Sequence, residues 1–132
     1  MLHAALRTNR LFLALCFGLL FLKAYSLSNS LLSGSLTSQT ATTFGFSGAA
    51  PAVSANSKNN AIVWAVERNT TSGKNILHAY SATNLANELY NSTQAGTRDT
   101  AGGTVKFVSP TVANGKVYVG CNGSLVVYGL LP

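Results

Sequence analysis

The sequence contains very few charged residues. Only 9% of its 132 residues are charged, compared with roughly a quarter in an average soluble domain. Three residues are acidic, Glu67, Glu88 and Asp99, and they form no recognisable calcium site, which needs about six to eight oxygen ligands. Polarity comes from Ser, Thr, Asn and Gly, so the composition favours short strands and turns over charged surface helices and suits an exported protein.

Cysteine and histidine are also scarce. Cys16 and Cys121 lie far apart, and no CxxC or Cys/His spacing occurs, so the sequence gives no support for a zinc site. A disulfide between them has no positive support, and removal of an N-terminal leader would abolish it. Cys121 is most simply a small residue in a strand or turn. His3 and His78 are isolated in the sequence.

The positive charge of the chain is not organised into a patch. The formal net charge is +6 at pH 7. A nucleic-acid-binding protein more often shows a basic stripe with interleaved aromatic residues. Here the basic residues are scattered along the chain, at Arg7, Arg10, Lys23, Lys58, Arg68, Lys74, Arg98, Lys106 and Lys116. We therefore expect no nucleic-acid partner.

One long apolar run occurs, at Leu11–Leu22. It follows Arg7 and Arg10 and precedes the small residues Ala24 and Ser26, which is the pattern of a secretory signal. A helix over this run would span roughly 18 Å, short of the ~30 Å hydrocarbon core, so a cleaved leader is favoured over a membrane anchor. A buried strand would give the same apolar run, and that alternative stays open.

The rest of the chain alternates between loops and short apolar runs. Residues 27–50 are rich in Ser, Thr and Gly and predict a loop with at most a short strand, and residues 93–104 predict a second loop. "LANELY" at Leu85–Tyr90 could form a helical turn but is too short to stand alone. Five runs have the length and composition of strands: Ala61–Val66, Ile76–Tyr80, Val105–Val108, Lys116–Gly120 and Leu125–Tyr128.

Two Asn-Gly pairs near the C-terminus predict tight hairpins. Asn114-Gly115 and Asn122-Gly123 are each flanked by alternating apolar residues, and this dipeptide favours type I′ turns, in which both central residues have positive φ. The stretch therefore predicts a three-stranded antiparallel meander. Val117, Val119 and Cys121 should point to one face of it, with Lys116, Tyr118 and Gly120 on the other.

The same order of segments occurs twice between residues 51 and 132. "PAVSAN" at 51–56 matches "PTVAN" at 110–114, "AIVWAV" at 61–66 matches "KVYVG" at 116–120, and "ILHAY" at 76–80 matches "LVVYG" at 125–129. A partial copy precedes them, because "FLKAYSLSN" at 21–29 aligns with "ILHAYSATN" at 76–84. Repeated units of this kind resemble the blades of β-propellers.

The residue pattern of these repeats resembles that of one protein family. "AYSATNLANELY" at 79–90 is a degenerate form of a repeat that reads Ala-x-Asp-x-x-Thr-Gly and then Trp: Ala79 matches, Ser81 replaces Asp and Tyr90 replaces Trp. "PTVANGKVYVGCNGSLVVYGL" at 110–130 is similar to the last blade of bacterial secreted or periplasmic members. Over about residues 21–132 the chain thus resembles the pyrroloquinoline-quinone (PQQ) repeat, quinoprotein-dehydrogenase-like β-propellers.

The resemblance implies an all-β fold and an incomplete propeller. We expect an apolar N-terminal segment at 1–26 (signal-peptide-like, helical, or a remnant blade strand), a loop at 27–50 and about two four-stranded antiparallel blades at 51–132. A complete propeller of the family has about seven or eight blades. In relatives the N-terminal segment is a strand of the preceding blade, so the chain resembles a C-terminal fragment of a longer propeller.

The resemblance carries over no catalytic residue. Enzymatic members hold PQQ above a Trp, with a Ca²⁺ ion, a catalytic Asp and often a vicinal Cys pair. Here Trp64, the single tryptophan, lies inside a predicted strand and is expected to be packing, and no vicinal Cys pair occurs. We therefore predict no catalytic, cofactor-binding or metal-binding residue, and the sequence indicates no clear small-molecule ligand. PQQ and calcium are implied by the family alone.

These observations favour a non-catalytic structural or interaction module that is secreted or periplasmic, with self-association through open blade edges. An uncleaved, membrane-anchored chain is the alternative location. Two other functions stay open: a remnant or subunit of a PQQ-dependent oxidoreductase, and a secreted surface or carbohydrate-binding module. For the last, three glycosylation sequons begin at Asn69, Asn91 and Asn122, as chance allows in a chain this rich in Asn, Ser and Thr.

Overall fold

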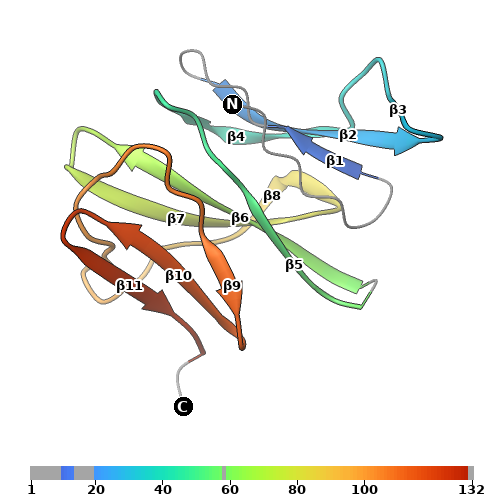
Figure 1. The fold of residues 1–132 in the computed structure, drawn as a ribbon. Helices are drawn as coiled ribbons and strands as arrows, with labels where there is room; N and C mark the ends of the chain where they lie inside the picture. The colour runs from blue at the N-terminus through green and yellow to red at the C-terminus, as the bar shows by residue number, and fades with distance from the viewer. Residues whose placement is uncertain (1–9, 14–19, 58, 131–132) are drawn as a thin grey trace.

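The structure, a computed structural model, describes residues 10–13, 20–57 and 59–130. In these residues the chain is all-β, as expected, and forms three separate antiparallel sheets, none of which closes into a barrel (Figure 1). The strands are β1 (Arg10–Leu13), β2 (Leu20–Ser28), β3 (Leu31–Leu32), β4 (Ser38–Phe44), β5 (Ala52–Asn56), β6 (Asn59–Asn69), β7 (Lys74–Ser81), β8 (Asn84–Asn91), β9 (Thr111–Ala113), β10 (Lys116–Cys121) and β11 (Ser124–Tyr128).

The N-terminal sheet consists of β1–β4, with β2 at its centre. β1 and β4 both pair with β2 in antiparallel fashion, and β3 forms a short hairpin with the end of β2. The described parts of the apolar segment, 10–13 and 20–26, are thus strands rather than helix. The segment at 27–50, expected to be a loop with at most a short strand, contains β3 and the seven-residue β4. β-branched Thr residues suit the strand geometry of β4.

The middle sheet is a regular four-stranded meander in the order β5-β6-β7-β8. The "LANELY" segment does not form a helical turn. It belongs to β8, which pairs with β7 through Ala79↔Tyr90 and buries Leu85 completely. Pairing with an existing strand and burial of Leu85 outweigh a local preference that is too weak to hold one helical turn.

The C-terminal sheet, in the order β9-β10-β11, confirms the predicted meander. Val117 and Val119 are buried on its inner face. Asn114 and Gly115 have φ values of 50° and 70°, as the type I′ turn requires. The second turn differs from the prediction, because only Gly123 has a positive φ. The Asn122 amide donates a 3.0 Å hydrogen bond to the Gly103 carbonyl, which holds Asn122 in an extended bridge.

Two further expectations about the second repeat are wrong. Val105–Val108 was expected to be a strand but contains a turn in which Phe107 is exposed and has a φ of 62°. The four residues are followed by Ser109-Pro110, and Pro cannot donate to a ladder. The second meander also has three strands rather than four, because β11 has no outer partner among the described residues. The expectation of four strands is met by the middle sheet.

The three sheets stack, with the middle sheet covered on both faces (Figure 1). One core cluster joins the N-terminal sheet, through Leu22 and Phe44, to Val63 and Tyr80 of the middle sheet. The other joins Val66 and Leu77 of the middle sheet to Val117 and Val119 of the C-terminal sheet. This alternation along β6 follows from the two-residue period of a strand, in which successive side chains face opposite sheets.

Gly102 and Gly103 fasten the middle and C-terminal sheets together at one end. Gly103 bridges to Lys74 at the start of β7 and to Asn122 in the last turn. Beside it, the buried Asn75 side chain donates a 3.3 Å hydrogen bond to the Gly120 carbonyl. A Cβ atom on Gly102 would lie 2.6 Å from Cβ of Cys121, so only glycine fits there. The two sheets are therefore in close contact at this end.

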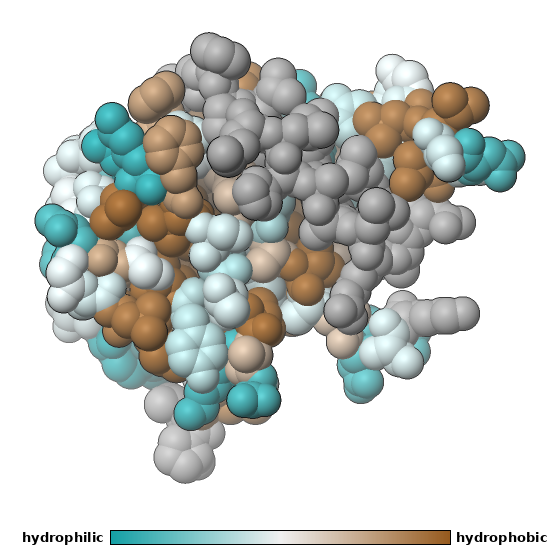
Figure 2. All heavy atoms as spheres, viewed as in Figure 1, coloured by the Kyte–Doolittle hydropathy of each residue, from teal (hydrophilic) through white to brown (hydrophobic). Residues whose placement is uncertain are grey.

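The surface carries several exposed apolar side chains. Figure 2 shows brown apolar atoms around β3, where Leu31, Leu32 and Leu36 are exposed. Leu125 and Val127 of β11 are exposed on the outer face of the C-terminal sheet. Among the described residues, no helix occurs that could cross a membrane.

Candidate functional site

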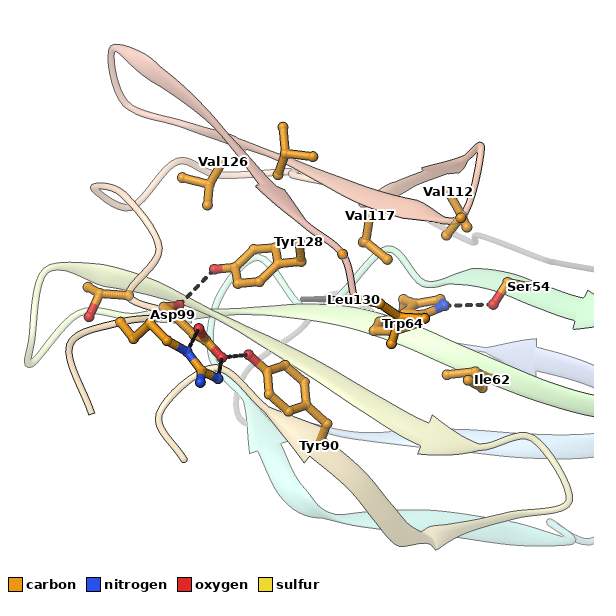
Figure 3. A pocket seen from close by; sticks show the side chains of 15 residues that line it. Ser54, Ile62, Trp64, Tyr90, Asp99, Val112, Val117, Val126, Tyr128 and Leu130 are labelled. Atoms are coloured by element: carbon orange, nitrogen blue, oxygen red, sulfur yellow. Dashed lines mark hydrogen bonds and ion pairs between the residues drawn. The ribbon is translucent and has the colours of Figure 1, made fainter. Parts of the chain in front are cut away.

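A cleft of about 750 Å³ lies between the middle and C-terminal sheets, at the end opposite the Gly103 fastening (Figure 3). The middle sheet contributes Ile62 and Trp64, and the C-terminal sheet contributes Val117 and Tyr128. The other lining residues lie in β5, β8, β9, the β9–β10 turn, β11, the 98–100 loop and the chain after β11. They are Ser54, Tyr90, Arg98, Asp99, Thr100, Val112, Gly115, Val126, Val127, Gly129 and Leu130.

The floor of the cleft follows from strand register. Trp64 pairs with Ala79, and Ala79 pairs with Tyr90, so the two rings lie in one row on the same face of the middle sheet. Trp64 is half-buried, and its indole Nε1 donates a 2.8 Å hydrogen bond to the Ser54 hydroxyl on β5. On the opposite wall, Val117 pairs with Tyr128. The prediction that Trp64 lies inside a strand and packs between sheets is confirmed.

Asp99 connects the two walls of the cleft. The Tyr90 hydroxyl donates a 2.7 Å hydrogen bond to Oδ2 of Asp99, and the Tyr128 hydroxyl donates a 3.1 Å hydrogen bond to the Asp99 backbone carbonyl (Figure 3). The Arg98 guanidinium donates to both carboxylate oxygens, at 2.7 and 2.9 Å. Asp99 thus accepts a hydrogen bond from one tyrosine of each sheet, and the adjacent Arg98 balances its negative charge.

These contacts shift the pKa values of the groups on the rim. Hydrogen bonds from Arg98 and then Tyr90 lower the pKa of Asp99 from 3.8 to about 2, so it is ionised at neutral pH. Burial, followed by the hydrogen bond and charge of Asp99, raises the pKa of Tyr90 well above its ordinary value. Burial also raises the pKa of Tyr128. Both tyrosines are therefore neutral hydrogen-bond donors at neutral pH.

A second polar cluster lies on the other face of the middle sheet, towards the N-terminal sheet. The buried His78 ring places Nδ1 2.6 Å from Oε1 of Glu88 and Nε2 3.0 Å from Oε2 of Glu67. Each ring nitrogen thus faces a carboxylate oxygen, so the ring contacts both glutamates at once. The ring also stacks on Tyr80 and meets the Phe44 ring edge-on.

The hydrogen bonds of this cluster stabilise the ionised form of Glu88. Burial raises the pKa of Glu88, but hydrogen bonds from His78 and Asn91 outweigh that effect, and the net pKa lies below the ordinary value. The sequence analysis treated His78 as isolated. The β6–β7 register, which pairs Ala65 with His78, would have placed Glu67 on the same face as His78, but that register cannot be read from composition.

The three acidic residues lie in different structural settings. Glu67 lies within β6, Glu88 in the edge strand β8 and Asp99 in a Gly/Thr-rich loop. Each is engaged by a neighbouring side chain. Cys121 is a half-buried free thiol, and Cys16 and His3 lie outside the described residues. Over the described ranges, no group of His, Cys, Asp and Glu side chains is arranged to hold a metal ion.

Searches with this chain against protein-family models, curated proteins and solved structures found no match. The site is therefore interpreted from its own geometry: an apolar cleft whose rim is a neutralised Arg–Asp pair held by two tyrosines.

Proposed function

We propose that the chain is a non-catalytic structural and interaction module, in which each sheet acts as a blade of an incomplete β-propeller of the PQQ-repeat type. The observation that carries this proposal is the repeated stacking of small antiparallel meanders, with the middle sheet covered on both faces. Successive blades of a propeller pack in this face-to-face manner. The two matched repeats also form meanders of the same strand order, β5-β6-β7 and β9-β10-β11.

The engagement of the acidic side chains supports a non-catalytic role. A general base must be within reach of a substrate proton. Glu67 and Glu88 instead bind opposite sides of the buried His78 ring, and Asp99 is held by Arg98 and Tyr90. No contact among the described residues favours the PQQ-dependent oxidoreductase or carbohydrate-binding alternatives.

The proposal predicts that the full chain associates through its sheet edges. Unpaired N–H and C=O groups at a strand edge are ready to pair with another chain. Among the described residues, β11 is paired on one side only. The stretch from Val117 to Leu130, which contains β11, has no charged residue or Pro that would discourage pairing. An incomplete propeller should therefore form concentration-dependent oligomers.

Light scattering coupled to size-exclusion chromatography over a concentration series tests this expectation, together with amide hydrogen exchange of the same samples. Association should slow exchange in β11 more than in β6, which is already paired on both sides. As a matched comparison, Val127→Pro removes an outward-facing amide donor of β11, because the Tyr118–Val127 pair is not hydrogen-bonded, whereas Val126→Pro removes a donor that β11 uses to pair with β10. A monomer at all concentrations with full protection of β11 would overturn the proposal.

A further inference from the structure

The cleft between the middle and C-terminal sheets has the dimensions of a small-molecule site. Ligand pockets commonly have volumes of about 300–1,000 Å³ and are lined mainly by hydrophobic and aromatic side chains with a few placed polar groups. The cleft measures about 750 Å³, and the rings of Trp64, Tyr90 and Tyr128 line it together with the aliphatic side chains of Ile62 and Val117 (Figure 3).

The cleft is held open rather than left loosely packed. At one end the two sheets meet at Gly103. On its rim, Asp99 receives a hydrogen bond from Tyr90 of the middle sheet and another from Tyr128 of the C-terminal sheet. These two contacts tether both sheets to the same loop residue, so a change in their separation there would strain or break a hydrogen bond. The result is a preformed space between two apolar walls.

The hydrogen-bonding state of the lining determines which ligand fits. The Trp64 indole N–H already donates to Ser54, and the hydroxyls of Tyr90 and Tyr128 already donate to Asp99. Among the lining residues that the structure describes, the charged side chains are Arg98 and Asp99, which pair with each other. A charged ligand would lose hydration on entering and would find no unpaired charge among these lining residues, which is costly. An uncharged aromatic ligand would lose little hydration and would gain contacts with three rings.

We propose that this cleft binds an uncharged, flat aromatic molecule between the Trp64 wall and the Val117–Tyr128 wall. The binding site goes beyond the proposed structural role and does not depend on the propeller assignment. Trp64 is the only tryptophan of the chain, so its fluorescence reports on the cleft directly.

A matched pair of probes tests the charge preference. N-phenyl-1-naphthylamine is uncharged, and its 8-sulfonate differs from it by one anionic group. We expect the uncharged probe to bind about tenfold more tightly, with energy transfer from Trp64 to the probe, because the described lining residues include no unpaired cation. The net charge of +6 favours the sulfonate at any non-specific surface site. Equal or tighter binding of the sulfonate at physiological salt would overturn the proposal.

Cleft-filling variants test the location. Val112→Phe adds volume at a half-buried lining position, and Ile62→Phe adds it on the opposite wall. Each should weaken binding of the uncharged probe about tenfold while circular dichroism stays unchanged, because the new ring occupies the ligand space. Two independent variants keep the test valid if one of them fails to fold.

The control is Leu31→Phe, which enlarges an exposed apolar side chain on the N-terminal sheet. We expect it to leave the affinity for the uncharged probe and the energy transfer from Trp64 unchanged. If Leu31→Phe strengthens probe binding, or if both cleft variants bind the probe as the parent chain does, the probe binds an exposed patch and the proposal is wrong.

Discussion

The Nε2 atom of His78 lies 3.0 Å from Oε2 of Glu67, so β6 and β7 are joined by side chains as well as by their backbone ladder. His78 is 4% exposed, and its second ring nitrogen contacts Glu88 of β8. One imidazole ring therefore links three consecutive strands of the middle sheet. Its removal would leave two partly buried carboxyl groups without their shared partner.

Replacing His78 should destabilise the fold. His78→Leu preserves much of the side-chain volume but removes both donors, and we expect a loss of about 2 kcal/mol in the free energy of unfolding. The loss is smaller than for a fully buried pair, because the Glu67 and Glu88 side chains are 19% and 30% exposed. Urea denaturation measures it. In a double-mutant cycle, His78→Leu and Glu67→Gln should be non-additive, and additive effects would show that the contact contributes nothing.

Acid should destabilise the protein in two steps. The folded-state pKa values of Glu88 and Asp99 are below their ordinary values of 4.5 and 3.8. Such groups contribute stability that is fully present above the unfolded-state pKa and is lost as pH falls through the folded-state pKa. Stability should therefore decline below about pH 4.5 and continue to fall towards about pH 2, where Asp99 titrates.

Two variants assign these steps in thermal unfolding measured across the pH range. Glu88→Gln should flatten the decline that begins near pH 4.5, and Asp99→Asn should flatten the part between about pH 4 and 2. Unchanged pH profiles in both variants would contradict the structural assignment of these carboxylates.

A methyl group at Gly102 should be poorly tolerated. Its Cβ would lie 2.6 Å from Cβ of Cys121 and 2.7 Å from Oγ of Ser124, so the two sheets would have to separate locally. We expect Gly102→Ala to cost about 1–3 kcal/mol of unfolding free energy. Gly120→Ala is the matched control, because no atom lies within 4 Å of the new Cβ. Similar stabilities of the two variants in urea denaturation would contradict the close approach.

The two Asn-Gly turns should respond differently to substitution. Asn114 has a φ of 50°, a conformation that Asn tolerates better than Ala, whereas Asn122 has no positive φ. Asn114→Ala should therefore cost about 1 kcal/mol more than Asn122→Ala in thermal or urea unfolding. Equal costs would indicate that both hairpins use the same turn type.

Local sequence signals predicted the C-terminal meander well, because its turns are short and its strands alternate regularly. Asn114-Gly115 determines the register of β9 and β10, and that register places Val117 and Val119 on the buried face. The same reasoning failed where tertiary contacts decide the outcome. Leu85 is completely buried, and its strand pairs with β7 although the isolated segment has no strong strand pattern.

The cleft could not be predicted in the same way. Its lining comes from segments as distant in sequence as Ser54 and Leu130, and it exists only because two sheets stack with one end fastened. Trp64 was predicted as a packing residue, which is correct for one part of its surface. Another part of the Trp64 surface faces the cleft. This exposure depends on the positions of Tyr128 and Asp99, which no local pattern specifies.

The bridge at Gly103 has a mechanical consequence. Because Gly103 contacts Lys74 of the middle sheet and Asn122 of the C-terminal sheet, its backbone sets the distance between the two sheets at that point. Neither Gly102 nor Gly103 lines the cleft. Substitutions that move this backbone would therefore change the separation of the cleft walls without altering a residue of the walls.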